Sequence, residues 1–233
     1  MTQPTTQLPR ARVITGTAAE QELHAMGLSP SNLTRPCVEG VQNAVAGYSP
    51  FEPAISFGFS IWSKIVGALR KQLNDEDWKH HDIANAPRSV SPDGTTAIAA
   101  VGGDSQTAHA DGNPRNARTK GPRFANEVEN NAVKSGAPRY TQCRLDLGAG
   151  DEDTAFANLQ TWVLLYFWDR TRNELRLELS LPIDCDKGFV TQWETRFILP
   201  VQDLSGHTDL SSDDDVRPYA ATQDVDFEIT AIS

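Results

Sequence analysis

The chain has 233 residues, of which 39% are apolar and 22% are charged, a composition typical of a globular protein with a packed core. It contains 31 Asp and Glu residues against 21 Lys and Arg, which gives a formal net charge of −10 at pH 7. This charge argues against a general nucleic-acid-binding protein and against a basic membrane-surface protein. No apolar run approaches the roughly 20 residues that span a bilayer, so we expect no membrane association.

The N-terminus is polar, contains two prolines and lacks the apolar run of a secretory signal. We expect residues 1–16 to form a flexible arm and residues 17–233 to form a single domain. The three cysteines, Cys37, Cys143 and Cys185, are odd in number and far apart. This pattern favours reduced thiols and therefore a cytoplasmic protein, and it does not indicate a zinc site.

The first third of the sequence predicts three helices. Thr17 and Glu20 have the spacing of a capping box, and the first helix should end at the breaker cluster 27–30. A second helix is expected over Pro36–Val45, before a proline-rich turn. The third helix is indicated by apolar residues that recur at helical spacing, namely Trp62, Ile65, Val66, Leu69 and Leu73.

The middle of the chain begins with a polar stretch, residues 78–96, whose prolines and Asp-Gly pair predict turns. Thr96–Val101 then reads as a short buried strand that ends at a glycine pair. A long polar loop follows as far as Pro122, which opens a helix predicted over Arg123–Lys134.

The last third is rich in strands. Thr161–Trp168 is almost continuously apolar and predicts a strand buried on both faces. Glu174–Leu181 alternates and should form an antiparallel hairpin with it, with the leucines inward. Two further strands are expected over Gln192–Val201, with Trp193, Thr195, Phe197 and Leu199 on one face, and over Asp224–Ile232.

Helices followed by clustered strands predict an α+β fold. We expect the helical N-terminal third to cover one face of a mainly antiparallel sheet formed by the C-terminal half. The opposite face should be solvated, because the alternate positions of its strands are charged or polar. Those charged residues are Glu174, Arg176, Glu178, Glu194, Arg196, Asp226 and Glu228.

The most informative segment for function is the loop over 103–123. Residues 113–123 carry four cations and no acid in a protein of strong negative charge, and they lead directly into a helix N-terminus, where free amides favour an anion. The spacing of a P-loop is absent. The loop therefore indicates either a solvated connection or an anion- or partner-binding segment, whose candidate residues are Arg115, Arg118, Thr119, Lys120, Gly121 and Arg123.

The same loop contains Asp104, His109 and Asp111, three residue types that bind divalent metals, and His109 also has the chemistry of a general base. Asp169, Glu174 and Glu178 flank the predicted hairpin, but no lysine accompanies them as in a metal-dependent nuclease. The motifs GxSxG, HExxH and GxGxxG are absent.

Three functional hypotheses follow from the sequence. The first is a soluble, cytoplasmic, non-catalytic binding or accessory protein that engages a protein partner or a small anionic ligand through loop 103–123. The alternative is a metal-dependent hydrolase or nuclease acting on a phosphate ester, the one hypothesis that requires a cofactor, a divalent metal. The third, based on the net charge of −10, is a polyanion mimic that occupies a nucleic-acid-binding partner, and the acidic segment 203–217, whose net charge is −4, could contribute to it.

Overall fold

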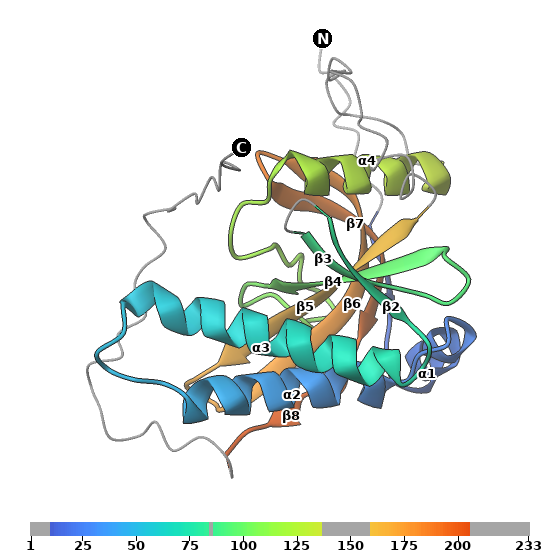
Figure 1. Ribbon diagram of the computed structural model, residues 1–233. Coiled ribbons are helices and arrows are strands. Elements are labelled where there is room, and N and C mark those ends of the chain that lie inside the picture. Colours follow the sequence, from blue (N-terminus) through green and yellow to red (C-terminus); the bar gives the residue numbers. More distant parts are fainter. Residues whose placement is uncertain (1–9, 84–85, 137–158, 206–233) are drawn as a thin grey trace, which may run out of the picture.

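The computed structural model describes residues 10–83, 86–136 and 159–205, and within these residues the chain forms four helices and eight strands (Figure 1). In chain order they are β1 (Arg12–Ile14), α1 (Gly16–Ala25), α2 (Pro30–Ala46), α3 (Ala54–Asn74), β2 (Lys79–Ile83), β3 (Ala86–Val90), β4 (Thr96–Gly102), α4 (Pro122–Ser135), β5 (Gln160–Asp169), β6 (Glu174–Asp186), β7 (Phe189–Ile198) and β8 (Gln202–Asp203).

The strands form one sheet in the order β1-β7-β6-β5-β4-β3-β2, with β8 paired to the start of β6. All neighbouring pairs are antiparallel except β1 with β7 and β4 with β5. The predicted α+β fold is therefore confirmed, including the β5–β6 hairpin. The sheet nevertheless draws four strands from the first half of the chain, and one of them, β1, lies within the segment 1–16 that we assigned to the arm.

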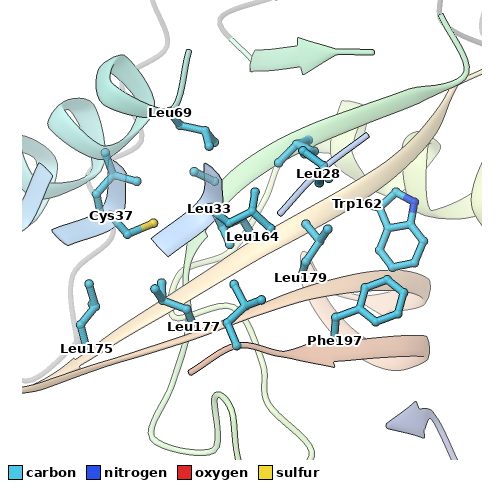
Figure 2. Close-up of a cluster of buried hydrophobic side chains, with 14 of the residues drawn as sticks. Leu28, Leu33, Cys37, Leu69, Trp162, Leu164, Leu175, Leu177, Leu179 and Phe197 are labelled. Atoms are coloured by element: carbon cyan, nitrogen blue, oxygen red, sulfur yellow. The ribbon is translucent and has the colours of Figure 1, made fainter. Parts of the chain in front are cut away.

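One face of the sheet carries the main apolar core, beneath α1, α2 and α3. The leucines of β6 point into this core as expected, and Figure 2 shows Leu175, Leu177 and Leu179 in the same buried cluster as Leu164 of β5. The helices α2 and α3 approach each other closely. A Cβ at Gly40 of α2 would lie 2.6 Å from the backbone of Ile65 in α3, so this contact requires a glycine.

The other face is covered as well, which corrects the expectation that it is solvated. Helix α4 packs on it with Phe124 and Val128, against residues of β4 and β5 that alternate with those of the main core. Figure 1 shows α4 on the side of the sheet opposite α2 and α3. The parallel pair β4 and β5 needs a crossover connection, and α4 is the helix within it.

Several predicted boundaries also need correction. Helix α2 begins at Pro30, because Ser29 and Asn32 form a capping box, and Pro36 lies inside the helix. The capping box expected at Thr17 does not form, since α1 has no side-chain cap. The stretch predicted to consist of turns contains the strands β2 and β3, whose polar sequence lacks an apolar alternation.

Strand β7 changes the face of its side chains part-way along its length. Phe197 and Leu199 belong to the main core, but Trp193 belongs to the cluster under α4. Irregular pairing with β6 between Leu181 and Cys185 causes the change, because an extra residue in one strand reverses its alternation. The strand predicted over 224–232 lies outside the described residues.

Membrane-spanning helices are not found in the part of the chain that the structure describes, where no helix has both the necessary length and apolar character.

Candidate functional site

Besides α4, residues 103–121, which we call the covering loop, bury the face of the sheet that the sequence predicts to be solvated. Glu178 on β6 is 0% exposed and Arg196 on β7 is 1% exposed. The two form a bidentate ion pair, with Arg196 Nη2 2.6 Å from Glu178 Oε2 and Arg196 Nε 3.0 Å from Glu178 Oε1. The expectation of a solvated charged face is therefore wrong for these residues and for the neighbouring Arg176, which is 6% exposed.

These charged side chains hold the backbone of the covering loop. The amide of Ala108 donates to Glu178 Oε2 at 2.8 Å, and Arg196 donates to the carbonyls of Gly112 and His109 at 2.6 and 3.1 Å. Arg176 Nη1 lies 2.7 Å from His109 Nε2. Since arginine only donates, this contact assigns the acceptor role to Nε2.

A second anchor is Asn116, which is 2% exposed. Its Nδ2 donates to the carbonyls of Arg118 and Gly188, and its Oδ1 accepts from the amide of Val190. Gly188 closes the β6–β7 hairpin at φ 79°, and a Cβ there would lie 2.6 Å from the carbonyl oxygen of Lys120. The covering loop therefore has a defined conformation, fixed at both ends of its basic half.

Beside this loop lies a pocket of about 440 Å³, which we call the α3–β5 pocket. It opens at the carboxyl ends of the parallel strands β4 and β5, between the first half of α3 and the basic half of the covering loop. Its walls are Gly58, Phe59, Ile61 and Trp62 of α3, Gly102, Gly103, Ala117, Arg118 and Lys120 of β4 and the covering loop, and Tyr166, Phe167, Trp168 and Arg170 of β5 and the turn after it.

The pocket is locally cationic. Its lining contains Arg118, Lys120 and Arg170, and no Asp or Glu is among the described residues that form it. Arg170 lies over two aromatic rings, 5.1 Å from the centroid of Phe57 and 5.0 Å from that of Trp168. Partial burial lowers the pKa of this guanidinium, which still remains charged at neutral pH because the ordinary pKa of arginine is far above 7.

Tyr166 contributes a neutral hydroxyl at the floor of the pocket, where its Oη would lie 3.6 Å from a Cβ at Gly102. Burial raises the pKa of the phenol, and the nearby charge of Arg118 opposes this effect only in part. The hydroxyl therefore keeps its proton at neutral pH and is available to donate a hydrogen bond.

Two of the six residues predicted to bind an anion, Arg118 and Lys120, line this pocket. Arg115 instead lies over the ring of Phe189, 4.9 Å from its centroid, and Arg123 lies 3.6 Å from Glu127 on α4. Thr119 and Gly121 are exposed and are not part of the lining.

Four backbone amides of the loop are not available to form a phosphate cradle. The amides of Gly103, Asp104, Ala117 and Lys120 all donate to carbonyls within the protein, at 2.8 to 3.1 Å. Backbone amides that are already paired cannot surround a phosphate as a P-loop does. Side chains, and not backbone amides, supply the positive charge of this pocket.

The predicted metal ligands do not come together. Asp104 accepts hydrogen bonds from the amides of Gln106 and Arg115, His109 contacts Arg176, and Asp111 is exposed. Across 10–83, 86–136 and 159–205, no group of three His, Cys, Asp or Glu side chains is placed to hold a metal ion. The separation arises because Asp104 and His109 are used to shape the covering loop.

The carboxylates considered for a nuclease are engaged by arginines instead. Arg176 Nη2 lies 2.7 Å from Asp169 Oδ2 and 3.7 Å from Glu174 Oε2. Glu178 forms its ion pair with Arg196. Of the cysteines, Cys37 is buried, which raises the pKa of its thiol and makes it unreactive. Cys143 and most of the acidic segment 203–217 lie outside the described residues.

Sequence reasoning missed the aromatic walls and Arg170. A signal exists in the run Tyr166-Phe167-Trp168, where three aromatic residues end a strand, but this run is equally typical of a buried strand. Nothing in the sequence indicates that the first half of α3 lies opposite it. Only the packing of α3 on the sheet brings Phe59 and Trp62 to the same pocket.

Comparison with known proteins assigns the chain to no family. No family model matches it, and neither does any curated protein or solved structure. What the pocket binds has therefore to be inferred from the chemistry of its walls.

Proposed function

We propose that this protein is a non-catalytic binding protein that takes a small anionic ligand into the α3–β5 pocket. One observation carries the proposal: a pocket in a protein of net charge −10 is lined by three cations and no acid among the described residues. Three cations around one recess, with no carboxylate among the described lining residues, create a positive local potential, so a lining of this kind favours a negatively charged ligand.

The position of the pocket supports the same proposal. Ligands commonly bind at the carboxyl ends of parallel strands, where the following loops diverge and leave a crevice. The volume lies within the range of roughly 300–1,000 Å³ that is usual for small-molecule sites. The ordered covering loop places Arg118 and Lys120 on one wall before any ligand arrives, which reduces the entropy lost on binding.

Isothermal titration calorimetry tests the proposal with benzoate, benzenesulfonate and phenyl phosphate, and with benzyl alcohol as the neutral control. We expect the anions to bind the wild-type protein and the alcohol to bind far more weakly. The double variant R118A/K120A should lose about 10- to 100-fold in affinity, the effect of one or two charge-assisted hydrogen bonds.

The matched control is R115A/R172A, which removes the same charge from two exposed side chains outside the pocket. It should retain the wild-type affinity. Equal weakening of both double variants would mean that overall charge, and not the pocket, attracts the anion. No binding of any anion to the wild-type protein would overturn the proposal.

A further inference from the structure

We propose that the ligand of the α3–β5 pocket is an aromatic carboxylate, a flat ring that bears one carboxylate and no hydrogen-bond donor. This inference rests on the proposed function and narrows it to one chemical class. It follows from three properties of the described lining residues: their hydrogen-bonding capacity, the number of cations without a partner, and the placement of their rings.

The first property is that the lining side chains donate hydrogen bonds and almost none accepts them. Arg118, Lys120 and Arg170 only donate, and the neutral hydroxyl of Tyr166 is the one side-chain oxygen in the described lining. Two main-chain carbonyls at the floor are already in use, since Gly102 accepts from Ala117 and Tyr166 accepts from Gly103, both at 2.8 Å.

A ligand with amino or hydroxyl donors would therefore lose hydrogen bonds to water and gain few in return. Nucleotides and sugar phosphates carry several such groups, on the base and on the sugar ring. A carboxylate consists of acceptor oxygens only and matches a wall of donors. The hydrogen-bonding capacity of the pocket thus selects against phosphorylated sugars and nucleotides.

The second property concerns the cations. In the part of the chain that the structure describes, the guanidinium of Arg118 has no hydrogen bond or ion pair, whereas Arg170 is held over Phe57 and Trp168. A single guanidinium without such a contact can bind one carboxylate through two parallel hydrogen bonds. A phosphate dianion ordinarily needs several donors, and the lining amides of Gly103, Ala117 and Lys120 are already paired.

The third property is the arrangement of rings. Phe59 and Trp62 of α3 lie 5.5 Å apart on one wall, and Phe59 is 60% exposed although it is a large apolar side chain. Tyr166, Phe167 and Trp168 line the other side. Aromatic side chains pack favourably on the faces and edges of another ring, so the walls favour a flat conjugated body over a flexible chain.

Calorimetric titration with 2-naphthoate tests the inference against four comparison probes: 2-naphthylmethanol, octanoate, AMP and inorganic phosphate. We expect 2-naphthoate to bind at least about ten-fold more tightly than each of the others. The variant R118A should weaken naphthoate binding about ten-fold and should leave the weak binding of the neutral alcohol unchanged.

A second variant, G58M, tests the place of binding. Gly58 lines the pocket, and a Cβ there would lie at an ordinary contact distance of 3.5 Å from Arg118 Nη2. A methionine therefore fits the backbone and fills the pocket, and in an exposed helix it is a better helix former than glycine. We expect naphthoate binding to fall at least about ten-fold with no decrease in Tm.

Each failure is distinguishable. If AMP or phosphate binds more tightly than naphthoate, and does so through Arg118, the aromatic carboxylate is wrong while the proposed function stands. Octanoate binding as tightly as naphthoate overturns the aromatic part of the inference. If no anion binds the wild-type protein, or if G58M binds naphthoate normally, the pocket is not the site and the inference is overturned.

Discussion

The two faces of the central sheet are both buried, but by different chemistry. Beneath α1–α3 the contacts are apolar, and the leucines of β6 pack into one continuous core. On the other face, the alternate residues of the same strand include Arg176 and Glu178, whose charges are covered by the loop that follows β4. A polar alternation therefore does not by itself indicate a solvated face. The same alternation of polar residues is found where the backbone of a loop covers the face.

The difference follows from what each face has to hold. The backbone groups of a helix bond to each other, so the helix needs no hydrogen bonds from the sheet. Burial of its apolar side chains is enough to hold it on the sheet. The covering loop has few apolar side chains, and backbone groups of Ala108, His109 and Gly112 bond to charged side chains of the sheet. Such a segment is held by hydrogen bonds between its backbone and charged side chains. Each of these bonds contributes about 1.5–3 kcal/mol.

The largest expected effect comes from breaking the buried ion pair. The variant E178A leaves Arg196 buried without a carboxylate and should lower the free energy of unfolding by about 3–5 kcal/mol. Its neighbour on the opposite face, Leu177, provides the comparison, since L177A should cost about 2–5 kcal/mol by leaving a cavity. Urea unfolding followed by circular dichroism measures both.

The control is R12A, which removes an exposed ion pair between Arg12 and Glu22 and should cost about 0–1 kcal/mol. The double variant E178L/R196M replaces the pair by apolar side chains and should recover much of the stability lost in E178A. If E178A costs no more than R12A, the ion pair does not hold the second face together.

A smaller effect is expected at Asn116, the other anchor of the covering loop. The variant N116A removes three hydrogen bonds to the backbone and should cost about 2 kcal/mol. Hydrogen exchange measured by mass spectrometry should accelerate in residues 103–121 and not in α2 or α3. The exposed Asn113 serves as the control, and equal exchange in N113A and N116A would contradict the assigned role.

The smallest expected effect is the contribution of Asp169 to stability, which depends on pH. A hydrogen bond from the Thr171 hydroxyl, with smaller contributions that include the charge of Arg176, lowers the pKa of this carboxyl. A lowered pKa in the folded state stabilises the protein above the unfolded pKa of about 3.9, and this contribution is lost as the pH falls towards the folded value.

The variant D169N should therefore be less stable than the wild-type protein at pH 7, and the difference should shrink below about pH 4. Thermal unfolding over pH 2.5–7, about the range in which carboxylates titrate, measures it. D111N removes the same charge from an exposed residue of the covering loop and controls for net charge. A difference between D169N and wild type that stays constant with pH would exclude the ionised Asp169 as its source.

Much of the fold could be predicted from sequence because its signals are local. The periodicity of α3, the continuous apolar run of β5 and the alternation of β6 each depend on neighbouring residues. The hairpin of β2 and β3 could not be predicted, because its polar residues owe their pairing to the edge of the sheet. Trp193 was assigned to the wrong face because a bulge reverses the alternation of β7.

The site was predictable only in part, for a related reason. A run of cations without acids is visible in the sequence and leads to Arg118 and Lys120, which do line the pocket. The partners that position them are distant in the chain, since Asn116 bonds to Gly188 and Val190, and Ala108 bonds to Glu178. Such pairings between residues 70 or more positions apart leave no local pattern.

The contact at Gly40 has a consequence for the range of ligands. Because α2 and α3 meet at backbone distance there, α3 has no freedom to shift towards α2, and it lies against the sheet on its other side. The helical wall that carries Phe59 and Trp62 is thus a rigid side of the pocket, and β5 supplies a second wall, whereas Ala117, Arg118 and Lys120 belong to a connecting loop. The covering loop is therefore the part of the pocket that would adjust to a wider or narrower ligand. Substitutions in residues 117–120 should change which ligand sizes bind, without moving α3.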